Sequence, residues 1–144
     1  MKNKKSIIFN SIVIALCVLT FVFLIFPGFA DEPGYILLGA GFQGFVQAIP
    51  IIFLALLVLL LLVSSIIALL GDCGAVKNVK LICFANKVSY LLAILIVFLY
   101  TVVICQLIAF AAHGTIFPWA SIVNIIIDIA ACVLVFVNYK IIRK

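Results

Sequence analysis

Four long stretches of the chain are apolar, and polar or glycine-rich segments separate them. They cover about residues 6–26, 46–70, 88–112 and 117–139. A helix needs about 20 apolar residues to cross the hydrocarbon core of a bilayer. Continuous apolar runs predict helices, since the strands of a membrane barrel alternate apolar with polar positions. The pattern predicts an all-α polytopic membrane protein, with residues 1–144 forming one bundle of four transmembrane helices.

Composition favours lipid over water as the surroundings of these helices. Of 144 residues, 69% are hydrophobic and 9% are charged, whereas soluble domains are about half apolar and a quarter charged. A soluble fold of this length leaves roughly a third of its unfolded-chain surface in water. It therefore lacks the interior to hide so much apolar area, and we expect the lipid bilayer to be the first partner of this chain.

The basic residues predict the orientation. All nine lie before the first stretch, between the second and third, or after the fourth. The two other connecting segments contain no Lys or Arg, and their charged residues are Asp31 and Glu32. By the positive-inside rule both termini are cytoplasmic, N-in and C-in. We expect Lys77, Lys80 and Lys87 to contact lipid headgroups. Basic clusters that adjoin apolar spans, rather than form one basic face, argue against nucleic acid as a partner. The small size and the Ile-, Leu- and Phe-rich spans suit a bacterial cytoplasmic membrane.

Two features of the first half leave alternatives open. Lysines, an apolar run and small residues at positions 28 and 30 resemble a signal peptide, whose removal would leave three spans in the same orientation. The run of about 20 residues exceeds the roughly 7–15 of a signal peptide, which favours a retained span. The glycine-rich segment 31–45 can lie flat at the outer interface, enter the bilayer partway or pack over the helix ends.

Asp128 is the one charged residue inside a predicted span. It lies near the middle of the fourth stretch, where a charged carboxylate costs about 2.5–3.5 kcal/mol on insertion scales. Such a group is normally turned inward, paired or protonated. Ser121 and Asn124 precede it at helical spacing, so the three residues share one face of the helix.

The third span supplies the expected neighbours of this face, because a short turn makes the two spans antiparallel. Gln106 lies level with Asn124, and Tyr100 and Thr101 lie near the level of Asp128. In one interpretation this polar cluster joins helices within the bundle or binds a basic residue of a partner chain. In the other it binds a proton or a cation, as intramembrane carboxylates do in transporters.

Groups that would carry catalysis are scarce. His113 is the only histidine, and the five cysteines follow no spacing typical of zinc sites or of a disulfide framework. No nucleophile, base and orienting group can be assembled within the spans. A G-x-G-x-x-G sequence at 39–44 lacks the strand and helix that the dinucleotide motif needs. We expect no enzymatic activity, no metal and no cofactor.

The leading functional hypothesis is a non-enzymatic accessory or assembly subunit, or an immunity-like protein. Such a protein would act through helix–helix contacts with another membrane protein or with its own copies. The alternative is a small transporter coupled to protons or cations, or a pore-forming oligomer, that uses the intramembrane carboxylate. A lytic, holin-like pore is a third possibility.

Overall fold

The computed structural model describes residues 4–25, 45–112 and 119–143, which form four helices with no strand among them. Helix α1 spans Lys4–Ile25, α3 spans Phe45–Asp72, α4 spans Val79–Ala112 and α5 spans Trp119–Arg143. Each contains a stretch long and apolar enough to cross a membrane. The prediction of an all-α chain with four long apolar helices is thereby confirmed for the described residues, and these helices fit a multi-pass membrane protein.

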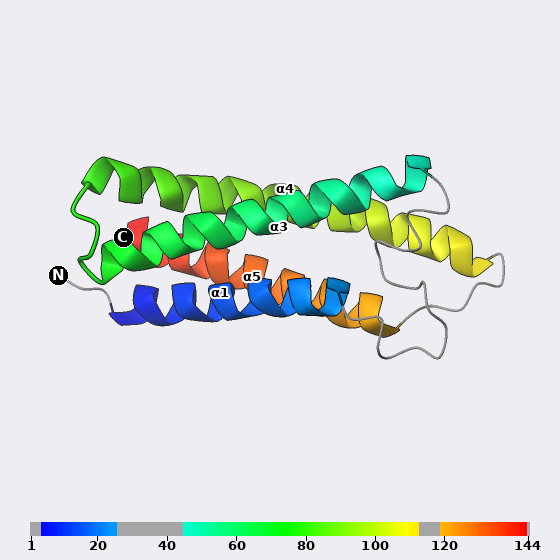
Figure 1. The fold of residues 1–144 in the computed structure, drawn as a ribbon, viewed down its shortest axis with the longest axis horizontal. Helices are drawn as coiled ribbons and strands as arrows, with labels where there is room; N and C mark the ends of the chain where they lie inside the picture. The colour runs from blue at the N-terminus through cyan, green and yellow to red at the C-terminus, as the bar shows by residue number, and fades with distance from the viewer. Residues whose placement is uncertain (1–3, 26–44, 113–118, 144) are drawn as a thin grey trace.

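Helices that are consecutive along the chain run antiparallel and pack side by side (Figure 1). Helix α1 contacts α3 and α5, and α4 contacts the same two helices. The four helices therefore form a closed up-down-up-down bundle around one core. The candidate cleavage site at residues 28–30, the outer segment up to residue 44 and His113 lie outside the described residues.

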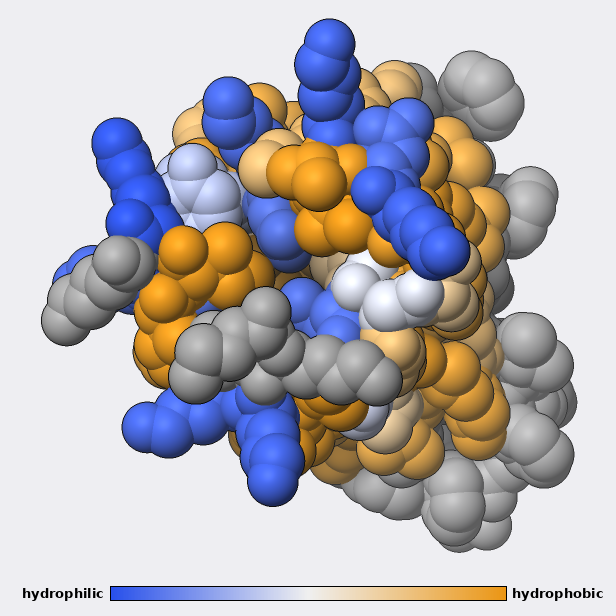
Figure 2. All heavy atoms as spheres, turned by 90° about the vertical axis from the view of Figure 1, so that its left-hand side faces the viewer, coloured by the Kyte–Doolittle hydropathy of each residue, from blue (hydrophilic) through white to orange (hydrophobic). Residues whose placement is uncertain are grey.

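The start of α1, the end of α5 and the α3–α4 connection meet at one end of the bundle (Figure 1). We call it the basic end, because hydrophilic side chains gather there (Figure 2). It carries the exposed residues Lys4, Lys5, Lys77, Lys80, Lys87, Lys140 and Arg143. The sequence clusters of basic residues thus come together in space at a single end of the molecule.

Local backbone chemistry defines the turn between α3 and α4. Gly74 has a φ of 82°, a conformation that glycine adopts without a Cβ penalty. The N–H of Gly74 bonds to the carbonyl of Gly71 at 3.0 Å, and that of Ala75 bonds to Leu70 at 2.9 Å, which is the Schellman pattern of helix termination. Asn78 caps the next helix, with its Oδ1 accepting from the Leu81 N–H at 3.3 Å.

Helix α4 begins at Val79, earlier than the predicted start of the third span at Val88. The predicted third span begins after Lys87, because charged residues are disfavoured in the hydrocarbon core. In the structure both lysines are exposed on the first turns of α4, so the charged segment continues the helix. With 34 residues and about 1.5 Å per residue, α4 is about 51 Å long and exceeds the roughly 30 Å hydrocarbon core.

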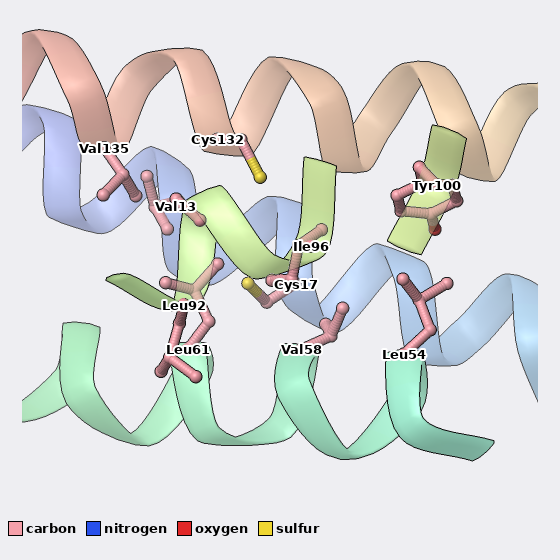
Figure 3. Close-up of a cluster of buried hydrophobic side chains, with 11 residues drawn as sticks. Val13, Cys17, Leu54, Val58, Leu61, Leu92, Ile96, Tyr100, Cys132 and Val135 are labelled. Carbon is pink, nitrogen blue, oxygen red and sulfur yellow. The ribbon is translucent and has the colours of Figure 1, made fainter. Parts of the chain in front are cut away.

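The middle of the bundle is filled by branched and aliphatic side chains from all four helices (Figure 3). Val13 of α1, Val58 and Leu61 of α3, and Ile96 of α4 are each at most 1% exposed. Ala93 and Ala131 are also buried, and small side chains at such positions allow helix backbones to approach closely. Close packing holds membrane helices together, because lipid chains provide no hydrophobic force between them.

Candidate functional site

A buried polar cluster joins three helices in the interior of the bundle. Asp128 on α5 forms two hydrogen bonds through its carboxyl group. Its Oδ1 is bonded to the hydroxyl group of Thr20 on α1, and its Oδ2 to the hydroxyl group of Tyr100 on α4. The three side chains are 1–2% exposed. We call Thr20, Tyr100 and Asp128 the central cluster. In an apolar interior its hydrogen bonds are strong, and an unpaired member would be costly.

The structure brings some of the predicted residues together and separates others. Tyr100 meets Asp128, whereas Thr101 is exposed and donates its hydroxyl hydrogen to the Val97 carbonyl at 3.0 Å. Asn124 is 1% exposed and lies one turn from Asp128, and its Oδ1 has no hydrogen-bond partner among the described residues. Gln106 and Ser121 were also predicted to belong to the polar cluster, but their side chains lie outside the described part of the structure.

Thr20 is the member of the central cluster that the sequence reasoning missed. A signal for it exists, because Ser6, Asn10, Cys17 and Thr20 recur at intervals of three, four or seven residues and therefore share one face of α1. All four side chains are buried. This periodicity marks the face of the first span that turns toward the bundle interior.

A second polar cluster lies at the basic end and joins α1, α3 and α5. Asp72 Oδ2 accepts hydrogen bonds from Ser6 Oγ at 2.6 Å and from Asn10 Nδ2 at 3.0 Å. Asn138 Nδ2 donates to Asn10 Oδ1 at 3.1 Å. We call Ser6, Asn10, Asp72 and Asn138 the end cluster. Asp72 is half-buried, unlike Asp128, so its carboxyl group has access to the surroundings of the bundle.

Apolar packing separates the two clusters. Asn10 and Thr20 are ten residues apart on α1, which is about 15 Å along the helix. Val13, Leu92 and Val135 fill the intervening interior (Figure 3). A hydrogen bond of 2.8 Å between Ser64 and Ser89 joins α3 to α4 in this region. The described side chains therefore provide two separate polar sites rather than one hydrogen-bonded path.

The predicted headgroup-binding residues Lys77, Lys80 and Lys87 are exposed at the basic end. Phe84 lies between the last two in the sequence and is 64% exposed. A basic segment with an exposed aromatic ring matches the chemistry of an interface between headgroups and acyl chains. This arrangement places cationic and apolar groups together where α4 begins.

Cysteine and metal chemistry receive little support from the described residues. Cys17 and Cys132 are buried in the core, Cys73, Cys83 and Cys105 are exposed, and all are free thiols. The described part of the chain holds no group of three His, Cys, Asp or Glu residues suited to a metal ion.

Comparisons with known proteins identify no relative of this chain. No protein-family model, no curated protein and no solved structure matches it. The features of the molecule that bear on its function are therefore the two clusters, the basic end and the outward faces of the helices.

Proposed function

We propose that this chain is a non-enzymatic membrane protein that acts through helix–helix contacts, as an accessory or assembly subunit or as an immunity-like protein. One observation carries the proposal: Asp128, the group best suited to chemistry, bonds to Tyr100 and Thr20 of its own chain. A polar cluster that joins three helices of one bundle holds these helices together. Recognition of a partner is then left to the outward faces.

Large apolar side chains cover these outward faces. On α4, Leu91 and Phe98 are 59% and 65% exposed and lie seven residues apart on one face of the helix. Lipid chains and a partner helix compete for such a face, and close packing decides between them. The accessory-subunit hypothesis requires that a partner occupy at least one of these faces in the native membrane.

Crosslinking from one outward position on each helix tests this hypothesis. A photoreactive residue replaces, in separate variants, Val18, Leu60, Leu91 or Val133, and the control variant replaces buried Ile96. We expect adducts with one protein of constant mass from one face of the bundle, either another protein or a second copy, and none from Ile96. The hypothesis fails if all four outward positions label only lipid and the chain is a lone monomer in mild detergent.

We further propose that the basic end faces the cytoplasm, in a bacterial cytoplasmic membrane. The proposal is supported by the seven exposed basic residues at that end and by the positive-inside rule. The exposed thiols of Cys73 and Cys83 test it in a variant that lacks Cys105. A membrane-impermeant maleimide should label them only after intact cells are permeabilised, and labelling from outside would reverse the orientation.

A transporter coupled to protons or cations, or a pore-forming oligomer, is the second candidate. It is favoured by Asn124, whose buried Oδ1 has no partner among the described residues and lies one helical turn from Asp128. An oxygen-rich site of this kind suits a proton or a hard cation. In reconstituted vesicles, Asp128→Asn should then abolish flux while Asp72→Asn preserves it. Flux that is equal in both variants would remove this candidate.

A further inference from the structure

The hydrogen-bond partners of Thr20 limit where the hydrogens of the central cluster can lie. Its Oγ1 lies 3.1 Å from the Leu16 carbonyl oxygen, and it also contacts Asp128 Oδ1. A hydroxyl group has one hydrogen to donate. The Leu16 carbonyl can only accept, and so can an ionised carboxylate. With Asp128 ionised, one of the two contacts would therefore lack a hydrogen.

A proton on Asp128 supplies the missing hydrogen. The Oδ1–H group of a neutral Asp128 donates to Thr20 Oγ1, and Thr20 then donates to the Leu16 carbonyl. Tyr100 donates its hydroxyl hydrogen to Oδ2, which is the carbonyl oxygen of the neutral acid. Each of the three contacts then contains one hydrogen, without any change in the positions of the heavy atoms.

Among the described residues, the groups around Asp128 provide no positive charge to stabilise the ionised form. Tyr100 faces it from α4, Thr20 and Cys17 lie on the buried face of α1, and Cys132 lies one turn along α5. From α3 the same core receives apolar side chains. The lysines and the arginine in the described part of the chain are all exposed at the basic end. A buried carboxylate without a cationic partner is strongly disfavoured in such surroundings.

We propose that Asp128 is a proton-binding site, held in the folded bundle as a neutral carboxylic acid between Tyr100 and Thr20. This inference is independent of the proposed function, because an assembly subunit and a transporter can both contain such a site. It has a structural consequence for the contact between α1 and α5. After loss of the proton, the single hydroxyl hydrogen of Thr20 can serve either the Leu16 carbonyl or Asp128. Deprotonation therefore weakens either a hydrogen bond within α1 or the contact between α1 and α5.

Infrared spectroscopy of the full chain in lipid vesicles tests the proposal at neutral pH. A neutral carboxylic acid has a carbonyl stretching band that a carboxylate lacks, and exposed aspartates, with pKa values near about 4, are ionised under these conditions. We expect the wild-type chain to show this band and aspartate labelled with ¹³C to shift it. Asp128→Asn should remove the band. Asp72→Asn is the matched control and should retain the band, because this substitution leaves Asp128 and its contacts with Thr20 and Tyr100 in place.

Tyr100→Phe provides a second measurement that does not depend on the folding of Asp128→Asn. It removes the hydrogen bond to the carbonyl oxygen of the acid, so the band should move to higher frequency. The proposal is overturned if the wild-type chain lacks the band at neutral pH or if the band survives in Asp128→Asn. It is also overturned if Tyr100→Phe leaves the frequency unchanged.

Discussion

The two buried clusters use similar side chains in different surroundings. Each contains one aspartate whose carboxyl group is hydrogen-bonded to side chains of α1. In the end cluster, Ser6 and Asn10 each donate one hydrogen to Asp72, and the half-buried carboxyl group lies beside the basic end. In the central cluster, Asp128 is 2% exposed, and its hydrogen-bond partners in the described part of the chain are hydroxyl groups.

The difference teaches that the number of available hydrogens and the access to water together determine the role of an intramembrane carboxyl group. A group near the end of a bundle can replace a lost partner with water, whereas a group at the centre cannot. Removing one partner of a buried polar group costs about 1–3 kcal/mol, because the remaining group keeps its desolvation penalty. The central cluster should therefore tolerate substitution less well than the end cluster.

The largest expected effect is that of Tyr100→Ala. This change removes a ring that is 1% exposed and also removes the donor to Asp128. Truncation of a buried aromatic residue typically costs about 3–5 kcal/mol. We expect a loss of this size in the free energy of unfolding, measured by denaturant titration in mixed micelles.

Phe98→Ala is the matched control for Tyr100→Ala. Phe98 lies on the same helix, but it is 65% exposed, and substitutions at such positions usually change stability by less than about 0.5 kcal/mol. Equal losses in the free energy of unfolding would mean that a buried aromatic side chain contributes no more to stability than an exposed one, which would contradict the interior position of Tyr100.

A smaller effect compares the two clusters directly. Tyr100→Phe keeps the ring and leaves Asp128 Oδ2 without its donor, so we expect a loss of about 1–3 kcal/mol. Ser6→Ala removes one of the two donors to Asp72, which keeps Asn10 and has access to water, so the loss should stay below about 1 kcal/mol. The same titration measures both variants. Equal losses, or a larger loss for Ser6→Ala, would contradict the contrast between a dry centre and a wet end.

The four apolar helices could be predicted because the signals for each helix lie within its own segment of the sequence. Apolar length and the positions of charge are properties of single segments, and lipid imposes them without reference to neighbouring helices. The same signals do not give the start of α4 at Val79. A helix can extend beyond the hydrocarbon core with its lysines exposed, as Lys80 is here.

Contacts between helices are harder to predict, because they depend on rotation about each helix axis. Tyr100 and Thr101 lie at nearly the same depth, but adjacent residues point about 100° apart. Depth alone therefore placed both near Asp128, and only Tyr100 contacts it. Thr20 was missed because a long connection separates the first two spans, so its partner depends on how the bundle closes between α1 and α5.

The smallest expected effect concerns Gly74, which terminates the helix that carries Asp72. Its φ of 82° places a residue with a Cβ in the left-handed region, at a cost of about 1 kcal/mol for alanine. Asparagine tolerates this conformation better. Gly74→Ala should therefore lower the free energy of unfolding by about that amount, and Gly74→Asn should lower it less.

The infrared band of Asp128 is the second measurement on the Gly74 variants, and it follows from the distance between the two clusters. Gly74 lies at the basic end, and the apolar layer around Val13 and Leu92 separates that end from Asp128. Strain at the turn should therefore leave the frequency of the band unchanged in Gly74→Ala. A shifted band would mean that the two clusters are coupled through the core, and the bundle would then respond as a whole to events at its basic end.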